Sequence, residues 1–318
     1  MTQHPSIDHS LFPHILDAVV AAAVASDPAS AWRTWRATSR AWRDRLDAIT
    51  FAHVIVSPSD DDDVVTIDAV PNGTHSSGVR IRIASPSPPS LLSLARTVDV
   101  CGRIRADHAT HLQRAFPCLE TLRLRSIAGS YTDFCALSSA ASRVVVFGTP
   151  TPARPPYPAP SPSLKRIVVH ACASFGASFL SQAVPRYGRR EVVLTFAGWA
   201  AAADGSPETS WVRGTRGADI ARTLARLLHG DDAGKCVVVD AERVHKEWLG
   251  FEMSNDSMCD TLASHVEAYL WEQVLPYGTP HGERAEAIEV ALRNLRFLSV
   301  AEYTAGMSAY ELEVETIE

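Results

Sequence analysis

Few side chains in this sequence stand at spacings that suggest catalysis or metal binding. Asp60 to Asp63 form a run of four carboxylates. A calcium loop needs spaced Asp or Asn side chains and a terminal Glu, so this run is typical of a solvated loop tip. His108 and His111, close to Asp107, would share one side of a helix, but a third ligand has no obvious source. We therefore predict no metal site.

A second candidate is the segment 230–236, GDDAGKC, which resembles a phosphate-binding loop. It is one residue short of that motif, lacks the Ser or Thr that holds magnesium, and precedes a predicted strand, where the motif follows one. The chain also has no Gly-x-Ser-x-Gly, Cys-x-x-Cys or Gly-x-Gly-x-x-Gly motif. Catalytic carboxylates can assemble from distant positions, but the missing motifs favour a protein that is not an enzyme and uses no cofactor.

The bulk properties narrow the range of partners. A formal net charge of −6 over 318 residues gives no overall attraction to nucleic acid or to an anionic membrane. The six cysteines lack the paired spacing of a zinc site and the density of a disulfide framework, so we expect mostly buried, reduced thiols. Residues 16–26 are apolar, but no Lys or Arg precedes them and Asp17 interrupts them, which argues against a secretory signal. We expect a location in the cytoplasm or nucleus.

Two helices are predicted at the start of the chain. The first begins near Pro13, because proline is tolerated in a first helical turn, and a break follows at Ser26, Asp27 and Pro28. The second presents three tryptophans on one face. The apolar stripes are Ile15, Leu16, Val19, Val20 and Ala23 in the first helix, and Trp32, Trp35, Ser39, Trp42 and Leu46 in the second. These stripes form either an ordinary two-helix core or a surface for a partner.

Short strands follow at a nearly constant interval. Residues 51–56, 64–68 and 79–83 alternate as strands do, and further strands are predicted at 97–100, 121–124, 144–147, 167–169, 192–195 and 237–239. The markers Val98, Leu122, Val144, Ile167 and Val193 are separated by steps of 24, 22, 23 and 26 residues. That interval is typical of a leucine-rich solenoid with one strand and one helix per unit. The longer step to 237–239 could hold two units.

The segments between the strands complete this fold prediction. Helices or turns are expected at 108–116, 133–141, 175–184 and 218–228, which makes the strands parallel. A doubly wound α/β sheet would give similar spacing and remains the alternative. Residues 150–162 hold seven prolines and residues 199–217 are rich in Ala and Gly, so both are expected to be loops. Helices at 258–275 and 283–296, then the alternating stretch 310–316, would form a terminal cap.

The first 48 residues resemble an F-box-like domain, the helical module that attaches substrate receptors to the S-phase kinase-associated adaptor of cullin-RING ubiquitin ligases. Phe12-Pro13-His14-Ile15-Leu16 matches the opening Leu-Pro-x-Glu-Ile-Leu of that family. Asp27-Pro28 and Ser39-Arg40-Ala41-Trp42-Arg43 stand near the expected distances. His14 replaces the acidic residue of the family, and Ala21-Ala22-Ala23 replaces a more leucine-rich middle. The whole chain is similar to fungal F-box-like proteins with irregular leucine-rich repeats.

This resemblance implies an α/β fold with two parts. An F-box-like helical module would span residues 1–48, and an irregular leucine-rich-repeat-like solenoid with parallel strands and a C-terminal cap would span 49–318. The implied function is that of a substrate receptor, which binds the ligase adaptor and an unknown target protein. The adaptor-binding residues would be Pro13, Ile15, Leu16, Val19 and Trp42. The alternatives are a non-catalytic repeat scaffold with a degenerate module that binds no ligase, and an α/β enzyme with a pocket at the carboxyl ends of its strands.

Overall fold

The structure is a computed structural model that describes residues 13–58, 65–70, 80–83, 90–102, 112–125, 141–147, 163–170, 190–196, 216–229, 234–244, 246–251, 255–274 and 280–316. Several sequence predictions concern residues outside these ranges. They are the Asp60 to Asp63 run, the His108 and His111 pair, the proline-rich loop 150–162, most of the loop 199–217, and the helices expected at 133–141 and 175–184. No helix among the described residues combines the length and the apolar character that crossing a membrane requires.

The N-terminal region folds into three helices, one more than predicted. The helix expected to carry all three tryptophans is divided, and Ser39 lies between its parts. The extended backbone of Ser39 and its side chain, which accepts a hydrogen bond from the backbone N–H of Trp42, make it the N-cap of the last helix. The helices are α1 (Pro13–Ser26), α2 (Pro28–Trp35) and α3 (Arg40–Thr50).

The rest of the chain is built around one large sheet. Its strands are β1 (His53–Pro58), β2 (Val65–Ala69), β3 (Arg80–Ile83), β4 (Thr97–Val100), β5 (Thr121–Leu124), β6 (Arg143–Phe147), β7 (Arg166–His170), β8 (Glu191–Thr195), β9 (Lys235–Val239) and β10 (Leu295–Leu298). They lie in the order β10-β9-β8-β7-β6-β5-β4-β1-β2-β3. Seven of the described pairings are parallel, and only those of β1 with β2 and of β2 with β3 are antiparallel. The predicted α/β class with parallel strands is confirmed.

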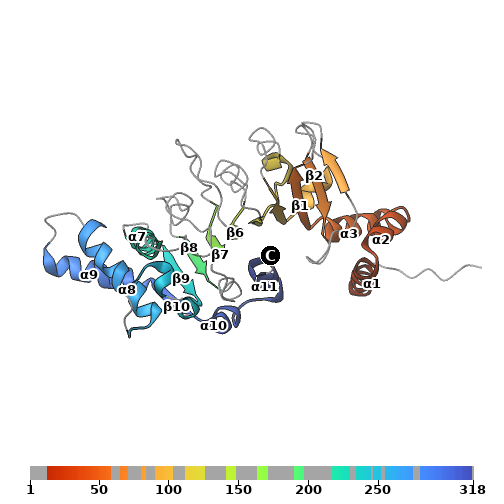
Figure 1. Ribbon diagram of the computed structural model, residues 1–318. Coiled ribbons are helices and arrows are strands. Elements are labelled where there is room, and N and C mark those ends of the chain that lie inside the picture. The colour runs from red at the N-terminus through yellow and green to blue at the C-terminus, as the bar shows by residue number, and fades with distance from the viewer. Residues whose placement is uncertain are drawn as a thin grey trace, which may run out of the picture.

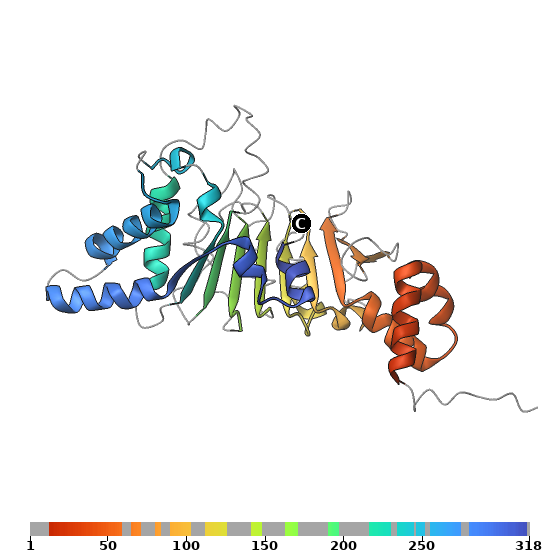
Figure 2. The same cartoon turned by 90° about the horizontal axis from the view of Figure 1, so that it is seen from below.

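From β4 to β10, every strand lies beside the strand that follows it in the sequence (Figure 2). β8 pairs directly with β9, so no further strand lies between these two in the sheet, and a second unit within the long step would have to be one without a strand at this place. The helix predicted for residues 283–296 extends too far, because its last two residues belong to strand β10. Leu295 and Arg296 instead pair with Cys236 and Val237 at the sheet edge.

The in-register parallel pairing places the side chains of successive strands on two faces of the sheet. Because side chains alternate along a strand, Val98 and Leu122 lie on one face, while Asp99 and Arg123 lie on the other. The first face forms the main core with helix α7 (Arg216–Leu228) and helix α8 (Met258–Tyr269). We call the second face, which carries Val145, Val168 and Val193, the strand face. Burial on both sides explains why the strand sequences are almost continuously apolar.

The C-terminal residues do more than cap the sheet edge. Helix α9 (His281–Arg293) leads into β10, and the chain then turns back through α10 (Val300–Thr304) and α11 (Ala309–Thr316). Figure 2 shows both short helices lying across the strand face, while α1 to α3 lie at the opposite end from α9. Residues 310–316, in which apolar and polar side chains alternate along the sequence, belong to helix α11. The remaining turns are η2 (Ser90–Leu94), η5 (Ala241–Arg243), η6 (Lys246–Leu249) and the π-helical η7 (Leu270–Val274).

The buried parallel sheet predicts the effect of shortening a central side chain. Leu122 is fully buried in the main core, so Leu122→Ala removes apolar contacts and leaves a cavity. We expect a loss of about 2–5 kcal/mol in the free energy of unfolding, measured by urea denaturation. Val290 on α9 is 50% exposed, and Val290→Ala should change that free energy by less than about 0.5 kcal/mol. Equal effects of the two substitutions would contradict the assignment of the core.

Candidate functional site

Helix α1 has apolar side chains on two faces. Leu16, Val20 and Val24 are buried in a small core that the three N-terminal helices share. Ile15 and Val19 stand four residues apart and are 53% and 43% exposed. Residues with this spacing lie on the same side of a helix, one turn apart. The inward face of α1 packs against α2 and α3, and the outward face exposes Ile15 and Val19 to solvent.

The five predicted adaptor-binding residues therefore occupy different environments. Ile15 and Val19 are accessible, whereas Leu16 packs inside the module, where it can position α1 but offers little area to a partner. Trp42 is half-buried and stands edge-to-face with Trp35, with ring centroids 5.1 Å apart. Pro13 opens α1, and its side chain lies outside the described part of the chain.

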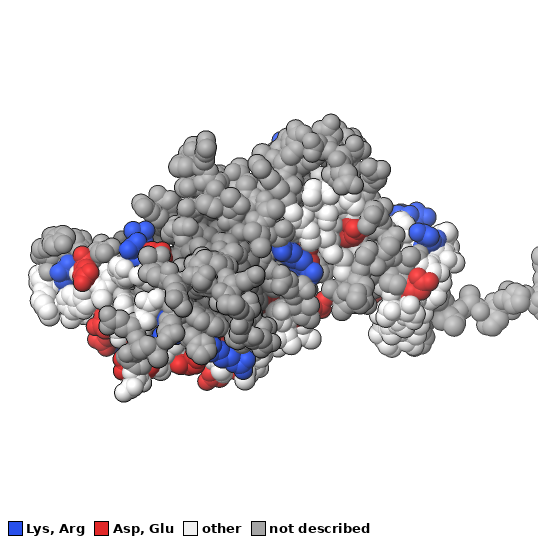
Figure 3. All heavy atoms as spheres, viewed as in Figure 1, with Lys and Arg blue, Asp and Glu red and all other residues white. Residues whose placement is uncertain are grey.

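A buried carboxylate joins α2 to α3. The carboxylate of Asp47 accepts hydrogen bonds from Trp32 Nε1 at 2.8 Å and from Arg36 Nε at 2.7 Å. Trp32 also packs edge-to-face against Phe51, which belongs to the core of the sheet. These contacts fix the helical module against the end of the sheet (Figure 1). Arg33, Arg40 and Arg43 of the module face solvent, and basic side chains gather in the region of α2 in Figure 3.

The strand face carries a second buried acid, Asp99 of β4. Its side chain is fully buried and lies 2.7 Å from Arg125 Nε, 3.1 Å from His53 Nε2 and 3.5 Å from Arg123 Nη1. Burial lowers the pKa of Arg123, and the charge of Asp99 opposes that shift. The guanidinium of Arg123 also lies over the ring of Phe147, 5.2 Å from its centroid. A buried carboxylate requires such partners, because removal from water strongly disfavours an unpaired charge.

Glu315 of α11 is the centre of a third buried cluster. Its carboxylate accepts a hydrogen bond from the Tyr303 hydroxyl at 2.5 Å and lies 3.0 Å from Arg166 Nη2 and 3.3 Å from Arg143 Nε. Burial, together with the charge of Glu315, raises the pKa of Tyr303, so its hydroxyl stays protonated and donates. Burial alone would lower the pKa of Arg166, but the neighbouring carboxylates, Glu315 foremost, raise it above its usual value. This cluster attaches α11 to β6 and β7.

His170 completes the contact between β7 and α11. Its Nε2 donates a hydrogen bond to the backbone oxygen of Glu315 at 2.6 Å, and its ring stacks on Phe147 with centroids 4.4 Å apart. Burial lowers the pKa of His170 to about 4, although the hydrogen bond to Glu315 opposes the shift. The imidazole is therefore neutral at physiological pH, with its proton on Nε2.

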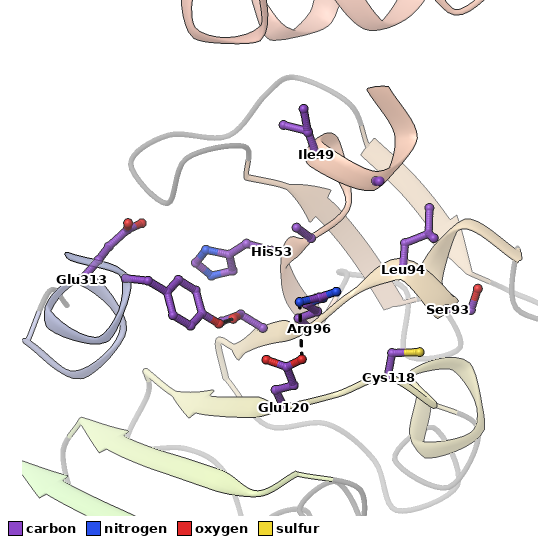
Figure 4. Close-up of a pocket in the computed structure, with 12 residues that line it drawn as sticks. Ile49, His53, Ser93, Leu94, Arg96, Cys118, Glu120 and Glu313 are labelled. Atoms are coloured by element: carbon purple, nitrogen blue, oxygen red, sulfur yellow. Dashed lines mark hydrogen bonds and ion pairs between the residues drawn. The ribbon is translucent and has the colours of Figure 1, made fainter. Parts of the chain in front are cut away.

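Beside α11 lies an open groove of about 1000 Å³. Figure 4 shows its lining, with Ile49 and Leu94 on one side and Glu313 of α11 on the other. Arg96 and Glu120 form an ion pair of 3.6 Å between them. The groove lies at the amino ends of β4 and β5. The segments that follow the carboxyl ends of these strands, where an α/β enzyme would place its pocket, are mainly outside the described residues.

The buried and half-buried cysteines lie in environments that keep their thiols protonated. Burial raises the pKa of Cys236 to about 12 and, with help from Asp99, raises the pKa of Cys101, so both thiols stay protonated and are poor nucleophiles. Of the four cysteines within the described ranges only Cys236 is buried, whereas most were expected to be. Searching the described part of the chain finds no group of three or more His, Cys, Asp or Glu side chains that could hold a metal ion.

Comparisons with known proteins add no relative. No protein-family model matches this chain, and no curated protein matches it.

Sequence reasoning missed the polar clusters of the strand face. Glu315 contacts residues 149 and 172 positions earlier in the chain, and no local pattern indicates a contact over such a separation. One signal was available, because Asp99 and Arg123 interrupt otherwise apolar strands at the same position. A charge inside a buried parallel strand requires a partner, and the register brings these two side chains together.

The environment of His170 predicts a dependence of stability on pH. An unfolded histidine has a pKa near 6.5, whereas that of His170 in the folded chain is lowered to about 4. Between these values the unfolded chain binds the proton and the folded chain does not, so the free energy of unfolding should fall as the pH decreases from 6.5 to 4. His170→Gln should reduce this slope in urea denaturation series. The exposed His14→Gln variant should retain it, and identical slopes in all three chains would contradict the assignment.

Proposed function

We propose that this chain is a substrate receptor of a cullin-RING ubiquitin ligase. Its N-terminal helices would bind the S-phase kinase-associated adaptor, and its strand face, which α10 and α11 cover in this structure, would bind the target protein once uncovered. The observation that carries the proposal is the exposed pair Ile15 and Val19 on α1. A protein that needs α1 only for its own core would be expected to place polar residues on that outward face.

The construction of the module supports the adaptor role. An exposed apolar surface is a useful docking site when rigid neighbours hold it in place, because less conformational freedom is then lost on binding. Leu16 and Val20 anchor the inner side of α1, and Asp47 ties α2 to α3. Ile15 and Val19 therefore lie on the exposed side of a helix whose opposite side packs in the core of the module.

The body of the protein supports the receptor role through its strand order. We infer that β4 to β10 form an irregular leucine-rich-repeat-like solenoid, because each strand pairs with its successor in the sequence and all run in parallel. A doubly wound sheet reverses its strand order at an internal switch point and continues with parallel strands on both sides. Here the order reverses between β4 and β1, but the strands beyond β1 are antiparallel, and β4 to β10 contain no reversal. Solenoids commonly use one extended face for protein partners.

Binding of purified adaptor tests the proposal directly. The double variant Ile15→Asp, Val19→Asp places two charges on the exposed pair and leaves the inner face of α1 unchanged. We expect adaptor affinity to fall by about tenfold or more in isothermal titration, because central apolar contacts in interfaces are worth roughly 1–2 kcal/mol or more. Val290→Asp is the matched control, since Val290 has similar exposure at the other end of the molecule, and it should bind like the wild type.

Two outcomes would overturn the ligase proposal. The first is a wild-type chain that binds no adaptor at micromolar concentration. The second is equal binding by the wild type and the Ile15→Asp, Val19→Asp variant, with unchanged circular dichroism. The first result would favour a non-catalytic repeat scaffold whose helical module binds no ligase, an interpretation that the alanines at 21–23 of α1 support.

A further inference from the structure

The part of the strand face under α11 is basic, and α11 itself is acidic. Arg143 and Arg166 stand side by side in register on β6 and β7. Each guanidinium meets carboxylates of α11: Arg143 lies 2.9 Å from Glu311 and 3.3 Å from Glu315, and Arg166 lies 3.0 Å from Glu315. Among the described carboxylates that pair with these two arginines, Glu191, a partner of Arg166, is the one that belongs to the sheet. The covered surface is thus complementary to carboxylates on a helix.

Helix α11 buries few of its own side chains, and polar contacts with Arg143, Arg166 and His170 supply much of its attachment. It has eight residues, of which only Val314 and Glu315 are buried. Tyr310 and Leu312 remain 46% and 40% exposed. A helix this short is not stable in isolation, so its structure depends on the sheet beneath it. Segments with few buried contacts open at a lower free energy than the core of a protein.

The surface that α11 covers continues into open space. Tyr310 and Glu313 of α11 form one wall of the groove of about 1000 Å³, and Arg96 and His53 lie on the sheet side of that groove (Figure 4). The hydroxyl of Tyr310 meets the hydroxyl of Thr97 at 2.6 Å at the boundary. A peptide longer than α11 could therefore extend from Arg143 and Arg166 into this groove.

We propose that α11 is an intramolecular occupant of a peptide-binding surface, and that an acidic segment of a partner protein displaces it. Carboxylates of that segment would take the places of Glu311 and Glu315 on Arg143 and Arg166, with an apolar side chain in the place of Val314. The inference rests on the proposed function only in treating the strand face as the target-binding surface. It does not require adaptor binding by α1.

Hydrogen exchange on the full wild-type chain tests whether α11 opens. The backbone amides of 309–316 should exchange through local opening, about tenfold or more faster than those of β7, because α11 has few buried contacts. Exchange of α11 amides at the rate of the β7 amides, through global unfolding alone, would overturn the proposal. This readout needs no substitution and applies even if a variant fails to fold.

Peptide binding to the full chain tests the chemistry of the surface. The probe is a fluorescein-labelled synthetic peptide with the sequence of residues 308–316. The double variant Glu311→Gln, Glu315→Gln weakens the tethered helix, so it should bind this peptide about tenfold or more tightly than the wild type, in which the tethered copy competes at high effective concentration. The control variant Glu286→Gln, Glu289→Gln makes the same charge change on the exposed side of α9 and should behave as the wild type.

A second peptide tests whether the surface recognises the carboxylates of the peptide or only its apolar side chains. It carries Gln in place of Glu at positions 311, 313 and 315, and we expect it to bind no form of the chain measurably. Equal binding of both peptides, or no binding of either to a folded Glu311→Gln, Glu315→Gln variant, would overturn the inference. The Ile15→Asp, Val19→Asp variant should bind the acidic peptide as the wild type does. A failure of adaptor binding can therefore be distinguished from a failure of peptide binding.

Discussion

The in-register parallel pairing from β4 to β10 is the constraint on which the rest of the molecule depends. Because every strand neighbours its successor, the alternation within each strand becomes two continuous surfaces across the sheet. One surface packs on α7 and α8 in the main core. The other receives α10 and α11, and its ordered register places Arg143 beside Arg166 under Glu315. The overall architecture and the charge pattern of the strand face therefore both follow from this register.

Burial of both faces also explains the polar clusters. Charged side chains in a buried sheet are tolerated when each has a partner, and removing one partner of a buried pair costs more than the pair itself contributes. Asp99 is surrounded by basic groups of β1, β5 and the residue after β5, while Glu315 reaches β6 and β7 from the end of the chain. The clusters favour an acidic segment on the strand face, because an uncharged or basic segment would remove both described carboxylates that Arg143 contacts and leave Arg166 with Glu191 as its one described carboxylate partner.

Local patterns predicted the strands well and the long-range contacts poorly. The bounds of β4 and β5 were predicted correctly because short apolar runs with clear flanks define them. The division of the second helix at Ser39 was missed, since its three tryptophans keep helical spacing across the cap. The helix of 309–316 was not predicted because its residues alternate, and packing on the strand face outweighs that pattern. The exposure of Ile15 and Val19 likewise depends on which side of α1 the other helices cover.

The most direct test of the account is hydrogen exchange of the full chain with and without the S-phase kinase-associated adaptor. The account predicts that the adaptor slows exchange in α1 and α2, and leaves α11 and the strands β4 to β10 unchanged, because the two binding surfaces lie on different elements. No protection in α1 at saturating adaptor, or protection confined to the strand face, would contradict it.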